Sequence, residues 1–186
     1  MKTLNIQTSK NIFRLHVIAN SNSESDQNLK YIVRDAVLNY INNISVGCTS
    51  KEEIIEIIKS HSQEIQNIAQ ETVYKQGFSY NVEIEIGNYN FPTKKYGDII
   101  FPPGLYDALR IKIGKAEGKN WWCVMFPPLC FIDTSSGIVP DSSKEIMKDG
   151  LSREEYQLIS ANSSEVKIKF KVVELLQNIS IGGIFM

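Results

Sequence analysis

The chain has 186 residues, and its 42% hydrophobic content is enough for one domain with a sizeable core. Its 20 lysines and arginines nearly balance 21 acidic residues, which argues against nucleic-acid or anionic-membrane binding. Residues 1–10 contain no apolar run long enough for an export signal or a membrane anchor. The sequence therefore predicts a single domain over residues 12–186, preceded by a flexible remnant over residues 1–11.

The first predicted element is a strand over residues 13–20, which is rich in β-branched residues. Apolar side chains then recur at helical spacing and predict an amphipathic helix over about residues 25–42. The polar residues 20–27 between them fit either helix capping or an anion site at the helix N-terminus. We favour capping, because this segment has no glycine that would let an anion approach the backbone.

A second amphipathic helix is predicted after residue 50, where Ser50 and Glu53 have the spacing of a capping box. Its apolar stripe continues through His61, and Gly77 is a suitable terminus. A second capping box, Ser152 to Glu155, predicts a short helix near the C-terminus, whereas residues 134–150 are polar and predict a mobile loop. The alternation after Val166 fits either a strand or a helix.

From residue 79 the apolar period changes from 3.6 to 2, which indicates strands. The predicted strands cover residues 79–86, 91–95, 99–101, 109–113 and 121–126. The sequence therefore predicts an α+β fold in which the N-terminal strand and two amphipathic helices pack on an antiparallel sheet. An antiparallel meander is the simplest connection, with the apolar residues 121–126 in mid-sheet.

Few residues suggest chemistry. The chain has two histidines and three cysteines, and no nucleophile, metalloprotease or phosphate-binding pattern occurs. We therefore expect no catalytic residue, no bound metal and no cofactor. Cys123 and Cys130 are candidates for a disulfide, provided that the two prolines between them reverse the chain, and the alternative is that both are reduced, buried thiols. The same cysteines with His16 are candidates for a metal or thiol site.

Residues 120–131 hold both tryptophans, two of the cysteines and two prolines. Trp121 and Trp122 are adjacent in a predicted strand, so they point to opposite faces, and one of them is expected to be exposed. An exposed tryptophan is a good interface anchor, but burial explains the segment equally well. Tyr96 and Tyr106 stand beside rigid proline-containing turns, which suit a preformed binding loop, although ordinary sheet turns explain them at least as well. These four aromatic residues are our candidate partner-binding residues.

Several motifs follow one another in a characteristic order. They are RLHVIANS at residues 14–21, FPTK at 91–94, YG at 96–97, PGLY at 103–106, NWWC at 120–123 and FPPLCF at 126–131. From about residue 12 to residue 133 this pattern resembles the stage II sporulation protein R family. Residues beyond 133 have no support from this resemblance.

The resemblance implies a signal of endospore formation that is made in the forespore and exported into the space between the two cells. There it activates a membrane-embedded aspartic protease of the mother cell, which processes the precursor of sigma factor E. Because family members carry an export segment, we expect that Met1 begins a trimmed chain. Such a signal binds a partner and needs no catalytic group, and the sequence leaves self-association open.

The alternative function is an extracytoplasmic zinc- or thiol-dependent hydrolase that uses His16, Cys123 and Cys130. It requires all three side chains to meet in the fold.

Overall fold

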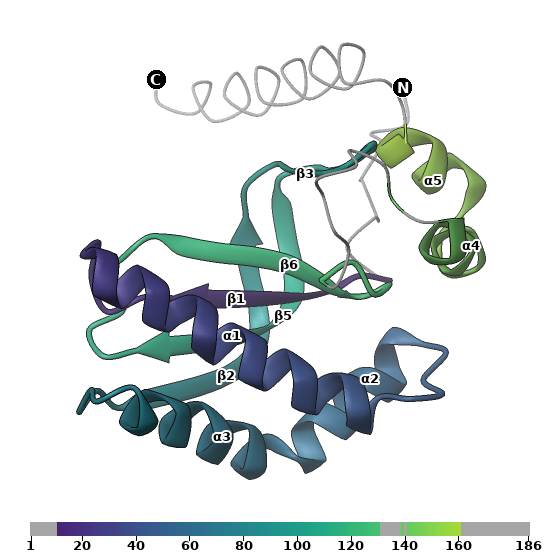
Figure 1. The fold of residues 1–186 in the computed structure, drawn as a ribbon. Coiled ribbons are helices and arrows are strands. Elements are labelled where there is room, and N and C mark those ends of the chain that lie inside the picture. Colours follow the sequence, from purple (N-terminus) through teal and green to yellow (C-terminus); the bar gives the residue numbers. More distant parts are fainter. Residues whose placement is uncertain (1–10, 131–138, 140, 161–186) are drawn as a thin grey trace, which may run out of the picture.

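The computed structural model describes residues 11–130, 139 and 141–160 (Figure 1). Its elements are β1 (Phe13–Ile18), α1 (Glu24–Ile44), α2 (Lys51–Ser60), α3 (Ser62–Lys75), β2 (Val82–Phe91), β3 (Lys94–Tyr96), β4 (Ile99–Phe101), β5 (Gly104–Ile113), β6 (Asn120–Phe126), α4 (Asp141–Gly150) and α5 (Arg153–Ser160). The predicted α+β class is confirmed. The expected remnant up to residue 10 and the ambiguous element after Val166 lie outside the described residues.

Four strands form the main sheet in the order β2-β5-β1-β6. β1 pairs in parallel with β5 and antiparallel with β6. The expected antiparallel meander is therefore wrong in its connections, because the first strand of the sequence inserts between β5 and β6. The first five residues of β1 are buried, and their backbone groups need a hydrogen-bonding neighbour on each side.

The central position expected for residues 121–126 is also wrong, because β6 lies at an edge of the main sheet. Its apolar character on both faces has another cause. Trp121 lies beneath Arg34 of α1, whereas Trp122 lies against Phe91 on the other face. A strand covered on both faces reads as a continuous apolar run even when one of its edges is unpaired.

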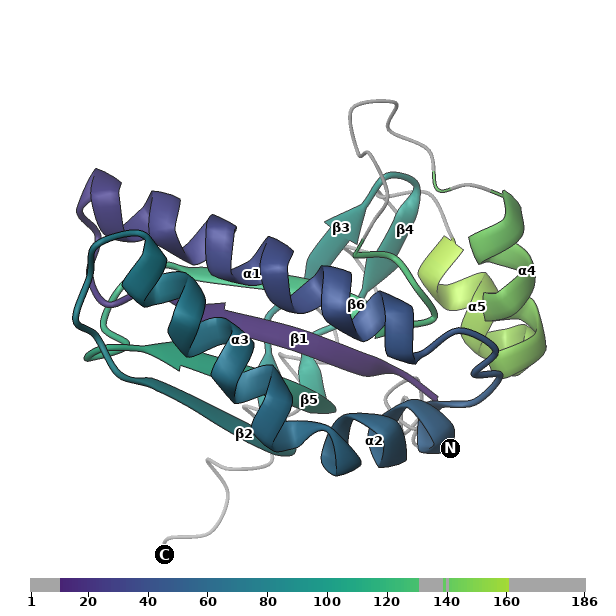
Figure 2. The ribbon, with the colours of Figure 1, turned by 60° about the horizontal axis from the view of Figure 1, so that its bottom comes forward.

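Helices α1, α2 and α3 cover one face of the main sheet, and α1 lies beside α3 (Figure 2). The buried side chains of α1 include Leu29, Val33, Val37 and Ile41, which have the spacing of one helical face. The predicted helix over residues 25–42 is confirmed, with ends at Glu24 and Ile44.

The N-terminus of α1 is capped by its own side chains. Ser23 accepts a hydrogen bond from the Asp26 N–H, and the Asp26 carboxylate accepts one from the Asn20 side-chain amide at 2.9 Å. Burial raises the pKa of Asp26, but hydrogen bonds from Ser21 and Asn20 outweigh this effect, so its pKa is lowered. The protein's own carboxylate therefore occupies this helix end, and the capping interpretation is confirmed.

The predicted second helix is divided at His61, whose φ of −102° and ψ of 14° interrupt the helical geometry. The predicted start is confirmed, since the Glu53 N–H donates to the Ser50 hydroxyl. Ile58 of α2 and Ile65 of α3 are both fully buried, so one apolar stripe runs across the break. Periodicity alone therefore did not reveal that there are two helices.

The mobile loop predicted over residues 134–150 is wrong for residues 141–150, which form α4. Residues 134–138 and 140 lie outside the described residues. The Met147 side chain of α4 is completely buried. The Asp98 carboxylate pairs with Lys144 of α4 at 2.7 Å and accepts a hydrogen bond from the Val139 N–H at 2.9 Å. One buried methionine and one ion pair leave no apolar repeat in the sequence, so this helix cannot be recognised within a polar segment. The short helix predicted from Ser152 is confirmed as α5.

Candidate functional site

Arg14 is completely buried on the face of the main sheet opposite the helices. Its guanidinium carbon lies 4.2 Å from the ring centroid of Phe91 and 4.8 Å from that of Tyr106. Burial lowers the pKa of Arg14, and these cation–π contacts offset part of the cost of removing the charge from water. Among the described residues, its Nε and Nη1 have no hydrogen-bond partner.

β3 and β4 form a second, two-stranded sheet, and Arg14 holds this sheet against β6. Its Nη2 donates to the Tyr96 hydroxyl at 3.1 Å, and that hydroxyl donates to the backbone carbonyl of Trp122 at 3.1 Å. Burial raises the pKa of Tyr96, which keeps the phenol protonated and able to donate. A chain of two hydrogen bonds therefore runs from the sheet interior to its outer edge.

His16 packs against the face of the Trp122 indole. The two rings stack with centroids 3.7 Å apart, and the imidazole Nε2 lies 2.9 Å from the Asn120 Oδ1. Burial lowers the pKa of His16 to about 4, so the ring is neutral at pH 7 and its Nε2–H donates to the amide oxygen. His16 thus holds the indole in place through packing.

Beyond β6 the chain reverses, and the Leu129 N–H donates to the Val124 carbonyl at 3.0 Å. This turn brings Cys130 back to Cys123, and the two form a disulfide with their Cα atoms 5.2 Å apart. The sequence leaves open a disulfide, two reduced thiols, or a metal or thiol site with His16, and the structure has the disulfide.

The structure contradicts a site that combines His16 with the two cysteines. In the β1–β6 register, His16 lies opposite Trp122 and Leu15 lies opposite Cys123, so the imidazole and the Cys123 sulfur point to opposite faces of the sheet. Both sulfur atoms are also used in the disulfide. Within the described residues, no three His, Cys, Asp or Glu side chains gather closely enough to ligate a metal ion.

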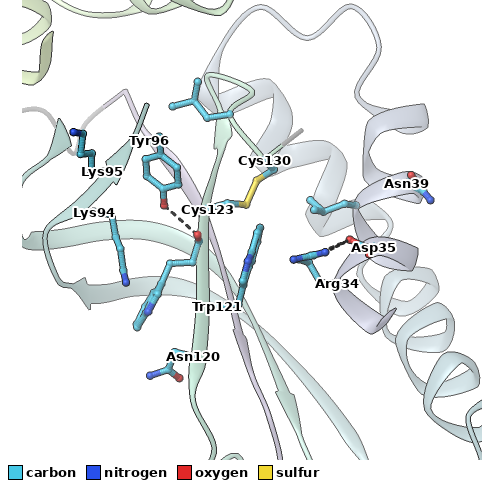
Figure 3. Close-up of a pocket in the computed structure, with 13 residues that line it drawn as sticks. Arg34, Asp35, Asn39, Lys94, Lys95, Tyr96, Asn120, Trp121, Cys123 and Cys130 are labelled. Carbon is cyan, nitrogen blue, oxygen red and sulfur yellow. Dashed lines mark hydrogen bonds and ion pairs between the residues drawn. A yellow bond between two sulfur atoms is a disulfide. The ribbon is translucent and has the colours of Figure 1, made fainter. Parts of the chain in front are cut away.

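A groove of about 800 Å³ runs along the outer edge of β6, and we call it the β6 groove (Figure 3). It is lined by Arg34, Asp35, Leu38 and Asn39 of α1, by β3, by residues 120–123 of β6, and by Leu129 and Cys130 of the turn. In Figure 3 the side chains of β3 and those of α1 flank Trp121 and the disulfide from opposite sides.

Each wall of the β6 groove carries basic side chains. Arg34 lies over the Trp121 ring at 4.6 Å, and Lys94 lies over the Trp122 ring at 5.9 Å. Arg34 pairs with its neighbour Asp35 at 2.6 Å, the single carboxylate in the lining. Among the described residues, no carboxylate pairs with Lys94 or with the exposed Lys95. The groove thus has two uncompensated positive charges, and one of them, that of Lys94, lies beside an indole ring.

Three of the four candidate partner-binding residues line the β6 groove: Tyr96, Trp121 and Trp122. Both tryptophans are half-buried on opposite faces of β6, whereas Tyr96 is only 8% exposed. Tyr106 is 1% exposed and donates its hydroxyl to the Pro102 carbonyl, and burial raises its pKa to about 12. Tyr106 therefore has no surface for a partner, because it forms part of the aromatic packing around Arg14.

Arg34, Lys94 and Lys95 are groove residues that the motif analysis did not select. Lys94 stands inside the FPTK motif and so had a signal in the sequence. The sequence did not show that Arg34 lies at a site, because its place over Trp121 depends on how α1 lies across the sheet.

Comparisons with known proteins find matches to the part of the chain that forms the β6 groove. The sequence model of the stage II sporulation protein R family matches residues 9–136, which is more than half of the chain. The chain belongs to the stage II sporulation protein R family. It is 45% identical over 124 residues to "Stage II sporulation protein R" of Bacillus subtilis (strain 168). That alignment covers 67% of this chain and 55% of the relative. No solved structure matches the chain significantly.

The family match includes every residue that lines the β6 groove and ends before α4 and α5. The resemblance noted in the sequence is therefore confirmed. In the described part of the chain, no helix is both long and apolar enough to cross a membrane.

Proposed function

We propose that this protein is an intercellular signal of endospore formation. In this proposal it is secreted by the forespore into the intermembrane space and binds a membrane-embedded aspartic protease of the mother cell. Binding activates the protease, which then processes the precursor of sigma factor E. Membership of the stage II sporulation protein R family supports the link to sporulation, and the motif resemblance supports the protease as partner.

The observation that supports a binding role most directly is the β6 groove. Its two half-buried tryptophans offer large apolar contacts at the places where Arg34 and Lys94 offer charge. Aromatic residues and arginine dominate the binding energy of many protein interfaces. The disulfide and the Tyr96 hydrogen bond hold the floor of the groove in one shape, which lowers the entropy lost on binding.

Activation by binding alone requires that the signal bind the active state of the protease more tightly than the inactive state. A shift from about 1% to about 99% active needs a difference in affinity of about 10⁴-fold between the two states. The two tryptophans of the rigid β6 groove can supply such a difference in affinity if the partner segment has the complementary shape only in the active protease.

The test is a reconstitution of the protease and the sigma factor precursor in vesicles, with this protein added from outside. We expect cleavage with the unchanged protein, and Trp121→Ala should require at least tenfold more protein for half-maximal cleavage. Tyr74→Ala is the control, because Tyr74 is 55% exposed on α3 and outside the groove. Circular dichroism checks that both variants fold.

Two results would contradict different parts of this proposal. No cleavage with the unchanged protein would exclude it as a sufficient signal. Full cleavage with folded Trp121→Ala at the ordinary concentration would keep the signal but remove the groove as its contact surface.

A further inference from the structure

We propose that the β6 groove binds an extended, acidic peptide segment of the partner, which adds to the free edge of β6 as a further strand. This inference deepens the proposed function by naming the chemistry of the partner segment, and it rests on that function only for the identity of the partner. Four features of the groove carry it: an unpaired edge, the direction of its backbone groups, the charge of its walls and the placement of its indoles.

The first feature is the edge itself. β6 pairs with β1 on one side, and within the described residues no strand pairs with its other side. An unpaired edge presents backbone N–H and C=O groups that another chain can use, which is the basis of peptide recognition by strand addition. The groove lies along this same edge, since residues 120–123 form part of its lining.

The second feature is which backbone groups remain open. The carbonyls of Trp122 and Val124 accept hydrogen bonds from Tyr96 and Leu129, so both point away from β1. In an antiparallel pair, alternate residues direct both backbone groups to the same side. The N–H and C=O of Asn120 and the N–H of Trp122 therefore point outward as well. The open part of the edge is the first half of β6, where Asn120 is exposed.

The third feature is charge. Arg34 on one wall and Lys94 and Lys95 on the other outnumber the single carboxylate of Asp35. Complementary charge favours a segment with Asp or Glu side chains over a neutral or basic one. It also disfavours a second copy of this chain, because pairing β6 with β6 of another copy would bring two such sets of cations together.

The fourth feature is the position of the two indoles. Trp121 faces α1 and Trp122 faces the opposite side of the sheet, so the two rings flank the edge from above and below. Side chains of an added strand alternate between the same two faces. One set would contact Trp121 near Arg34 and the other would contact Trp122 near Lys94. This match favours an extended segment over a helix, whose side chains repeat every 3.6 residues.

The test uses the full chain without the protease, and its probe is a library of random 12-residue peptides displayed on phage. We expect enriched peptides to carry Asp or Glu at alternate positions. Binding of the synthesised best peptide should weaken at least tenfold in Lys94→Glu/Lys95→Glu. The matched control is Lys59→Glu/Lys75→Glu, which makes the same change in net charge at exposed positions of α2 and α3 and should bind as before.

Strand addition is separated from simple charge attraction by N-methylation of the peptide. Methyl groups on one alternate set of backbone nitrogens should weaken binding at least tenfold, whereas methyl groups on the other set should have little effect, because only one set faces β6. Equal tolerance of both sets would overturn strand addition.

The proposal is also overturned if the library yields no binder, or if the binders lack acidic residues or bind the Lys94→Glu/Lys95→Glu variant normally. A dimer in light scattering that the best peptide dissociates would instead assign the groove to a second copy. None of these outcomes depends on protease cleavage, so failure here and failure of the signalling proposal are distinguishable.

Discussion

His16 and Arg14 show how two polar residues of one strand are used in packing. Both stand on β1 and point to the face away from the helices, where they are 3% and 0% exposed. Neither is paired with a carboxylate among the described residues. Each instead contacts aromatic rings, Trp122 for His16 and Phe91 for Arg14. These contacts connect the centre of the sheet to the floor of the β6 groove.

The buried imidazole should make stability depend on pH. Unfolding restores the pKa of His16 from about 4 to the ordinary value of 6.5, so the unfolded chain binds more protons between these values. The free energy of unfolding should therefore fall as the pH falls through this window, by about 2 kcal/mol between pH 7 and pH 5. Urea unfolding at both pH values measures the change.

The matched variant for this measurement is His16→Phe, which keeps a ring against Trp122 but has no proton to gain. Its unfolding free energy should lose about 2 kcal/mol less than that of the unchanged protein over the same pH interval. An equal loss in both proteins would show that other groups cause the pH dependence.

The Tyr96 hydroxyl should contribute to stability through its two hydrogen bonds. Tyr96→Phe leaves the Arg14 Nη2 and the Trp122 carbonyl without this partner, and Tyr96 is 8% exposed. We expect the free energy of unfolding to fall by about 1–3 kcal/mol. In Tyr74→Phe, a change at a 55% exposed site, it should shift by less than about 0.5 kcal/mol. Equal effects in the two variants would mean that the hydroxyl bonds contribute nothing.

At the scale of elements, β6 and the turn after it form one unit. The Leu129 N–H closes the turn, and the disulfide between Cys123 and Cys130 links the strand to the far end of that turn. The side chains of this unit form the floor of the groove, whereas α1 and β3 form its walls. The shape of the groove therefore depends on the covalent link.

Breaking the disulfide should destabilise the protein. For the short loop between cysteines seven positions apart, the loss of chain entropy in the unfolded state corresponds to about 2.5 kcal/mol. Urea unfolding with and without a thiol reductant measures this difference. Cys123→Ser/Cys130→Ser should match the reduced protein and be insensitive to reductant, and a reductant effect that persists in this variant would contradict the assignment.

At the scale of the whole molecule, α4 and α5 complete the core beside the second sheet, and α5 packs against β4. Met147 of α4 is completely buried. Met147→Ala should therefore lower the free energy of unfolding by about 2–3 kcal/mol. The exposed Glu145 of the same helix is the control, and Glu145→Ala should change it by less than about 0.5 kcal/mol. A neutral Met147→Ala would mean that α4 adds nothing to the core.

The sequence was informative about local structure and silent about long-range pairing. The period of apolar residues located α1, and Ser50 marked the start of α2. The place of β1 between β5 and β6 could not be predicted, because pairing partners far apart in sequence leave no periodic signal. The break at His61 was hidden for a related reason, since the apolar stripe continues through it.

The candidate site was predicted in part. The aromatic character of residues 120–131 points to Trp121 and Trp122, and both line the groove. The proline-containing turn beside Tyr106 indicates a binding loop, but Tyr106 is buried, because residue type does not tell which face of a strand is covered. The sequence does not predict that Arg34 lies in the groove, because a helix of mixed charges gives no indication of which charged side chain lies over an indole.

The hydrogen bond from Tyr96 to the Trp122 carbonyl has a further consequence, for solubility. Together with the Leu129 bond to Val124, it occupies the second half of the β6 edge and leaves only a short stretch open. Proteins with long open edges aggregate by edge-to-edge pairing, and blocking part of an edge prevents this. The protein can therefore keep part of this edge open with less risk of pairing edge to edge with another copy.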